Sequence, residues 1–96
     1  MMINLNTIYF RSPRIVARKT GDEYVLVPVS DAIADMRSVY TLNETGAFIW
    51  EKLDGIKNVR DIIAEVEGEF LIDGKTALED VLSFFHDLRE YLIIAE

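Results

Sequence analysis

The 96-residue sequence contains no cysteine and only one histidine, and these shortages exclude several kinds of functional site. Without cysteine the chain cannot form a disulfide, a thiolate metal site or a cysteine nucleophile. His86 has no second histidine with which to share a metal ion, so no metal and no cofactor are expected. Ser83 has no histidine–aspartate pair to activate it, and the few glycines form no phosphate-binding loop. We therefore expect that the protein is not an enzyme.

Long hydrophobic runs are also missing from the sequence. No stretch approaches the roughly 18 apolar residues that indicate a membrane-spanning helix, and the N-terminus lacks the apolar core of a signal peptide. Together with the absence of cysteine, this favours a cytoplasmic location. Half of the residues are hydrophobic and 28% are charged, and the length suits a single domain over residues 1–96.

Basic residues are scarce in the second half of the chain. Residues 1–42 carry five basic and four acidic side chains, a net charge of +1, whereas residues 43–96 carry five basic and thirteen acidic side chains, a net charge of −8. Nucleic-acid binding requires clustered lysine and arginine, so this balance argues against it. The acidic half forms either a solvated surface that keeps the protein soluble or an acidic docking face.

The first half of the chain has the pattern of short strands. Runs rich in β-branched and aromatic residues predict strands at residues 14–20, 23–29 and 38–42. Gly21-Asp22 predicts the hairpin turn between the first two. Residues 1–13 are expected to be flexible or to add an extra strand.

Three helices are expected after the strands. Asn43 and Asn58 are suitable N-caps, because an asparagine side chain can accept a hydrogen bond from a first-turn N–H. The first helix is expected to be closed by Gly55, the second to span residues 59–70 and the third residues 75–91. The apolar tail at 92–95 forms either a short strand or an extension packed on the sheet. This order predicts an α+β, winged-helix-like fold, with a three-stranded antiparallel sheet followed by three helices.

The third predicted helix has a wider apolar surface than a core alone requires. One stripe is typical of a core face and consists of Leu78, Val81, Phe85, Leu88 and Leu92. Leu82 widens this stripe on one flank, and Ala77, Phe84 and Tyr91 widen it on the other. Either the helix is packed on both flanks, or one flank lines a groove for a ligand.

Three strings of residues carry a family resemblance: LNETGAFIWEKLDG at 42–55, NVRDIIAEVEGEF at 58–70 and LEDVLSFFHDLREYLII at 78–94. Together they resemble the PqqD-like family, which is named after coenzyme PQQ synthesis protein D. The resemblance extends over residues 14–94. It implies a peptide chaperone, also called a RiPP precursor-peptide recognition element. Such a protein binds the leader of a ribosomally made precursor peptide and presents it to a modifying enzyme, often a radical SAM maturase.

The resemblance also implies where the leader binds: as an added strand beside the third strand and over the third helix. The strand edge would then consist of Ser38, Val39, Tyr40 and Thr41. The groove would be lined by Leu78, Leu82, Phe85 and Arg89, with Arg89 able to meet an acidic residue of the leader. The flank with Ala77, Phe84 and Tyr91 is the alternative.

Two other functions use the same features. The edge strand and the groove suit a structural or dimerisation module equally well, in which a second copy of the chain forms a homodimer. A winged-helix nucleic-acid-binding domain would use the helix at 75–91. That helix has two basic residues, Lys75 and Arg89, against Glu79, Asp80, Asp87 and Glu90. Its net charge of −2 repels phosphates, so this function is disfavoured.

Overall fold

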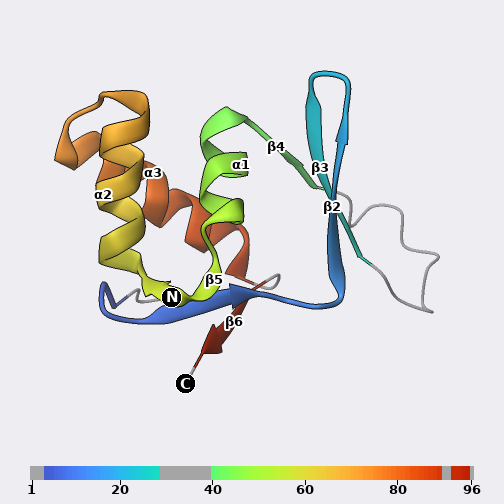
Figure 1. The fold of residues 1–96 in the computed structure, drawn as a ribbon, viewed down its shortest axis with the longest axis horizontal. Coiled ribbons are helices and arrows are strands. Elements are labelled where there is room, and N and C mark those ends of the chain that lie inside the picture. The colour runs from blue at the N-terminus through green and yellow to red at the C-terminus, as the bar shows by residue number, and fades with distance from the viewer. Residues whose placement is uncertain (1–3, 29–39, 90–91, 96) are drawn as a thin grey trace.

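The computed structural model describes residues 4–28, 40–89 and 92–95 of the chain, which Figure 1 draws as a coloured ribbon. The strands and helices of this part are, in order, β1 (Ile8–Arg11), β2 (Ile15–Thr20), β3 (Glu23–Pro28), β4 (Tyr40–Leu42), α1 (Glu44–Glu51), β5 (Asp54–Asn58), α2 (Val59–Phe70), α3 (Gly74–Asp87) and β6 (Leu92–Ala95). The helices form one cluster, in which α1 lies between α2 and the strands β3 and β4 (Figure 1).

The first sheet has the order β2-β3-β4 and is antiparallel throughout. β2 and β3 form the predicted hairpin, which pairs from Ile15 opposite Pro28 to Thr20 opposite Glu23. Gly21 in its turn has a φ of +61°, which glycine adopts without strain. β4 pairs with β3 and stands at the end of the sheet order. The predicted fold class, a three-stranded antiparallel sheet with three helices, is confirmed.

A second sheet, with the order β5-β1-β6, adds to the predicted fold. β1 lies within the N-terminal segment 1–13 and pairs antiparallel with β5 on one side and with β6 on the other. β6 is formed by the apolar tail at 92–95. Figure 1 shows β1 passing beneath α1 and α2, so the helical cluster has a sheet at its base as well as at its side.

The first helix ends earlier than the sequence suggests, and the prediction that Gly55 closes it is wrong. α1 has Lys52 as its C-cap, and the backbone N–H of Lys52 donates to two carbonyls of the last turn. Gly55 lies in β5 with a φ of +80°, next to an irregularity in the pairing of β1 and β5. The left-handed conformation of Gly55 therefore serves the irregular pairing of β5 with β1, and not the end of a helix.

The predicted N-caps of the first two helices are confirmed. The side-chain oxygen of Asn43 accepts a hydrogen bond from the backbone N–H of Gly46 at 2.8 Å. Asn58 and Asp61 form a capping box, in which each side chain accepts from the backbone N–H of the other residue. These bonds satisfy donors that the first turn of a helix leaves without an intrahelical partner.

The third helix is shorter than predicted. It begins at Gly74, where Asp73 is the N-cap and accepts from the backbone N–H of Thr76 at 2.8 Å. It ends at Asp87, with Leu88 as the C-cap, rather than at residue 91. The chain has to leave the helix here, because residues 92–95 pair with β1.

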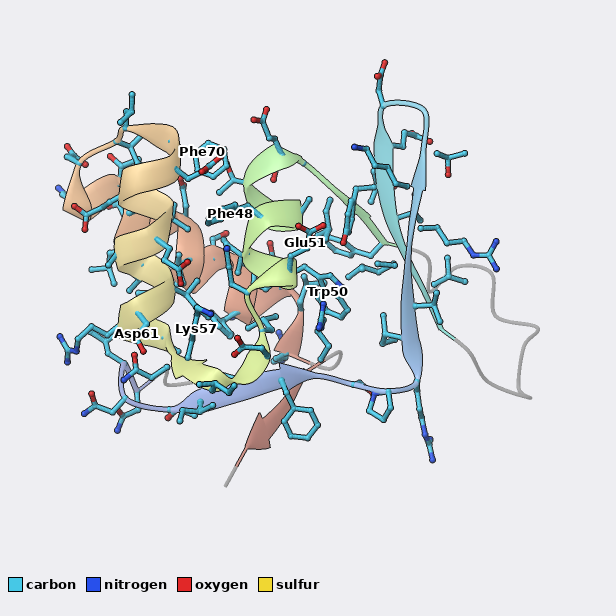
Figure 2. All side chains as sticks on the ribbon, in the orientation of Figure 1. Phe48, Trp50, Glu51, Lys57, Asp61 and Phe70 are labelled. Carbon is cyan, nitrogen blue, oxygen red and sulfur yellow. The ribbon has the colours of Figure 1, made fainter. Side chains whose placement is uncertain are left out.

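The core joins the helices to both sheets. Trp50 of α1 and Phe85 of α3 are its largest fully buried side chains. β1 contributes Tyr9, whose ring lies 4.8 Å from that of Phe85, measured between centroids. Between α1 and α2, Phe48 and Phe70 meet edge to face at 5.4 Å (Figure 2). The two sheets and the helices are thus one packed unit around α3.

Candidate functional site

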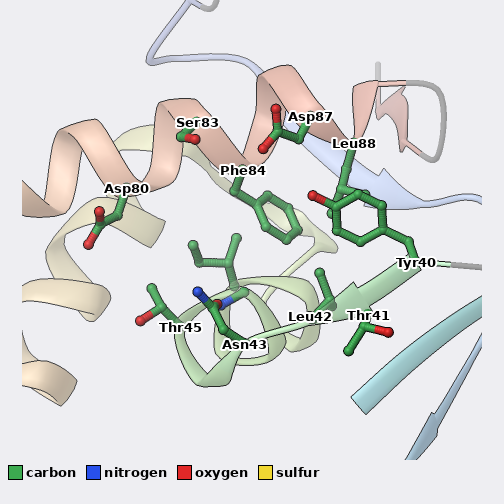
Figure 3. A pocket seen from close by; sticks show the side chains of 12 residues that line it. Tyr40, Thr41, Leu42, Asn43, Thr45, Asp80, Ser83, Phe84, Asp87 and Leu88 are labelled. Carbon is green, nitrogen blue, oxygen red and sulfur yellow. The ribbon is translucent and has the colours of Figure 1, made fainter. Parts of the chain in front are cut away.

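A cleft of about 290 Å³ opens between β4, the start of α1 and α3 (Figure 3). On one side it is lined by Tyr40, Thr41 and Leu42 of β4 and by Asn43, Thr45, Gly46 and Ile49. On the other side it is lined by Asp80, Ser83, Phe84, Asp87 and Leu88. The last strand of the described sheet β2-β3-β4 and a helix therefore face each other across one hollow.

The floor of the cleft is apolar and continuous with the core. Leu42, Ile49, Phe84 and Leu88 all belong to the buried hydrophobic cluster, and each still borders the cleft. Tyr40 is half-buried at one end. A ligand side chain that entered here would lie against hydrocarbon and rings, which favours an apolar group.

The rim of the cleft is polar and acidic. Asp80, Ser83, Phe84 and Asp87 follow one another at the spacing i, i+3, i+4 and i+7, which places them on one face of α3. Figure 3 shows Asp80 across the cleft from Thr45, and Asp87 on the part of α3 nearest Tyr40. Both carboxylates are on exposed residues. The lining described by the structure contains no lysine, arginine or histidine.

The turn between β4 and α1 gives the cleft its shape. Asn43 is extended, with φ −81° and ψ −178°, so the chain changes direction at once from strand to helix. Gly46 allows the close approach, because a Cβ at this position would lie 3.2 Å from Asn43 Oδ1 and 3.2 Å from Leu42 Cδ2. Contacts this short would force the neighbouring side chains to move.

The structure brings together part of the predicted site. Tyr40 and Thr41, which were predicted to offer the strand edge, line the cleft, while Ser38 and Val39 lie outside the described residues. The predicted helical residues Leu78, Leu82, Phe85 and Arg89 do not line it. The described helical side is instead the alternative flank, represented by Phe84; Tyr91 lies outside the described residues and Ala77 is buried.

Packing explains why the other flank of α3 does not line the cleft. Phe85 is fully buried and its ring contacts Tyr9 of β1, a strand whose position the sequence pattern did not reveal. Leu78 and Leu82 are half-buried. Arg89 is exposed and its guanidinium donates to the backbone carbonyl of His86 at 2.8 Å. The signal that could have found the open flank is the polar triplet of Asp80, Ser83 and Asp87 around Phe84.

The described residues with shifted pKa values lie away from the cleft. Hydrogen bonds from the backbone N–H groups of Lys57 and Ile56, and then from the Lys57 ammonium, hold the pKa of Asp54 well below its usual range. Burial, followed by the nearby carboxylate of Glu51, raises the pKa of Tyr24, which donates to Glu51 at 3.2 Å. These groups stabilise turns and contacts of the fold, and none of them lines the cleft.

Two further features of the described part of the chain bear on its chemistry. No three histidine, cysteine, aspartate or glutamate side chains come together there in a way that could hold a metal ion. Its helices are all too short or too polar to cross a membrane.

The chain has two similarities to known proteins. The family model described as Coenzyme PQQ synthesis protein D (PqqD) matches residues 23–94. A solved structure, TbiB1 in complex with the TbiA(beta) leader peptide, superposes with a TM-score of 0.68 at 25% sequence identity, covering 86% of this chain and 93% of the TbiB1 chain. No curated protein shows significant similarity. The family match includes β3, β4 and all three helices, and therefore every residue of the cleft. The chain belongs to the family of coenzyme PQQ synthesis protein D.

Proposed function

We propose that this protein is a non-catalytic peptide chaperone that binds the leader of a ribosomally synthesised precursor peptide. The leader would lie in the cleft between β4 and α3. Three observations support the proposal: membership of the PqqD family, similarity to TbiB1, whose solved structure contains a leader peptide, and an apolar cleft beside an edge strand. The last of these carries most weight, because it belongs to this chain itself.

Binding by strand addition fits the position of β4. In the described part of the chain, the sheet order places β3 on one side of β4 and no other strand beyond it. A peptide strand added there would extend the sheet through backbone hydrogen bonds, as in other cases of β-augmentation. Each bond contributes about 0.5–1.5 kcal/mol net, whereas ordering each peptide residue costs about 1–2 kcal/mol. Backbone pairing alone therefore gives little affinity.

The apolar floor supplies the missing affinity. A large apolar side chain of the leader, buried over Phe84, Leu88 and Ile49, would contribute about 1.5–3 kcal/mol. Two such side chains would contribute about 3–6 kcal/mol. This range includes the roughly 4 kcal/mol that corresponds to a millimolar dissociation constant. Tighter binding then requires further contacts at the rim of the cleft.

The leader would be presented to a modifying enzyme while it is held in the cleft. The family resemblance favours a radical SAM maturase as that enzyme. Homodimerisation through β4 is the alternative use of the same edge, and sedimentation with and without peptide separates the two. A chaperone remains a monomer that binds one peptide, whereas a dimerisation module associates without any peptide.

The proposal is tested by blocking the cleft without disturbing the core. A tagged copy of the chain is purified from its source cell, and the short peptide that accompanies it is sequenced and synthesised. Ser83 is an exposed residue of the lining, so Ser83→Trp should fill the cleft and weaken binding of this peptide at least about tenfold.

The matched control is Glu79→Trp, which adds the same ring to an exposed position of α3 outside the lining. It should leave the affinity unchanged, and both variants should melt near the temperature of the unaltered protein. Equal affinity of the Ser83→Trp variant and the unaltered protein would contradict binding in the cleft.

A further inference from the structure

We infer that the peptide accepted by this cleft carries a lysine or arginine two residues from its apolar anchor. This inference rests on the proposed function and deepens it, because it names the chemistry of the ligand. It follows from three properties of the cleft: the charge of its rim, the spacing of that charge along α3, and the apolar floor between the charges.

The charge of the rim is not neutralised by the described residues. Asp80 and Asp87 are exposed and take part in neither of the ion pairs that this part of the chain contains, Lys52–Glu65 and Lys57–Asp54. Arg89, the lysine or arginine nearest in sequence to Asp87, lies outside the lining and donates to the carbonyl of His86. The described lining therefore presents a negative field to a ligand, and a cationic group is the complementary one.

The spacing along α3 suits an extended peptide. A helix rises about 1.5 Å per residue, so Asp80 and Asp87 lie about 6 Å and about 4.5 Å from Phe84 along the axis, on opposite sides. An extended chain rises about 3.3 Å per residue and alternates its side chains, so neighbours on one face lie about 6.6 Å apart. With its anchor over Phe84, residues two before and two after the anchor face the two carboxylates.

Lysine and arginine can bridge the small differences between these spacings. Their long apolar stems can lie along the cleft wall while the charged group reaches the rim. Pairs at an exposed rim contribute only modestly to affinity, but they repel peptides that carry acidic residues at the same positions. Among apolar peptides, the rim would thus select those with a basic residue near the anchor.

The inference is tested with a displayed library of random peptides, selected on the unaltered protein. Peptides that depend on the cleft are defined as those that do not bind the Ser83→Trp variant. We expect these peptides to be enriched in lysine or arginine two positions before or after a large apolar residue. Cleft-dependent peptides without this enrichment would overturn the inference and leave the proposed function standing. A selection in which no peptide depends on the cleft would overturn both.

The selected peptides then allow the carboxylates to be tested directly. The double variant Asp80→Asn/Asp87→Asn should weaken the binding of a basic selected peptide by about three- to thirty-fold, with a smaller loss at high salt. The control Glu79→Gln removes one charge from the same helix outside the lining and should change binding less than twofold. An equal loss in the control and in the single variants Asp80→Asn and Asp87→Asn, which each remove one charge, would show that only overall charge matters, and would overturn the inference.

Discussion

The two flanks of α3 differ in what covers them, although both are apolar. Phe84 and Phe85 are neighbours in sequence and their rings meet edge to face, 5.7 Å apart. Phe85 lies against Tyr9 of β1 and is completely buried, whereas Phe84 borders the cleft beneath β4. The width of an apolar helix face therefore does not by itself identify a binding site. The strand that covers one flank makes that side part of the core, and the other side borders the cleft.

The largest expected effect comes from truncating the covered flank. Phe85→Ala should lower the free energy of unfolding by about 3–5 kcal/mol, because it leaves a cavity under Tyr9. Phe84→Ala should lower it by less, since one side of that ring already borders the cleft. Denaturant unfolding of both variants measures the difference. Equal losses of unfolding free energy in the two variants would contradict the difference between the flanks.

The effect of the two variants on peptide binding should be the reverse of their effect on stability. At temperatures where both variants are folded, Phe84→Ala should weaken the binding of the co-purified peptide more than Phe85→Ala does. The reason is that Phe84 borders the cleft directly, whereas Phe85 reaches it only through its neighbours. A greater loss of binding with Phe85→Ala would favour the flank predicted from the sequence.

A smaller effect on stability is expected when acid protonates Asp54 of β5, the strand that pairs with β1. Asp54 is the first residue of β5, the partner of β1, and it holds the turn at the start of this strand by accepting hydrogen bonds from Ile56 and Lys57. The pKa of Asp54 is lower in the folded protein than in the unfolded chain, so its contribution to stability is present above the unfolded value, near pH 4, and is lost as the pH falls below it.

This pH dependence is measured by following stability in denaturant as the solution is acidified. Asp54→Asn should flatten the loss of stability below about pH 4, because asparagine does not titrate. The cleft should still bind its peptide at neutral pH in this variant. An unchanged acid slope in Asp54→Asn would mean that the turn does not contribute as described.

The sequence predicted the elements whose signals are local. Asn43 and Asn58 mark helix starts by chemistry that acts within one turn, and Gly21 marks the hairpin by its backbone freedom. β5 escaped prediction because its sequence, DGIKN, lacks the alternation of a strand and includes residues that strands disfavour. Only its pairing with β1, far away in the chain, makes it a strand.

The lining of the candidate cleft was predicted only in part, because some of it depends on contacts between distant parts of the chain. Tyr40 and Thr41 follow from the position of a short strand just before a capped helix. The flank of α3 depended on β1, whose residues were expected to be flexible or to add a strand of unknown position. Without Tyr9 in place, the apolar pattern puts Phe85 in the central stripe and Phe84 on one flank, but it does not tell which of the two another element covers. Choosing between them required the contact between Tyr9 and Phe85, two residues 76 positions apart in the sequence.

Binding of the co-purified peptide between β4 and α3 is tested most directly by mapping the residues that it affects. Isotope-labelled protein is titrated with that peptide, and the backbone amide signals are followed by NMR. If the peptide binds in the cleft, the largest shifts are expected at Thr41 of β4 and at Ser83 and Asp87 of α3, with small shifts at Leu78 and Leu82. Shifts concentrated at Leu78 and Leu82, with none at Thr41 and Ser83, would contradict it.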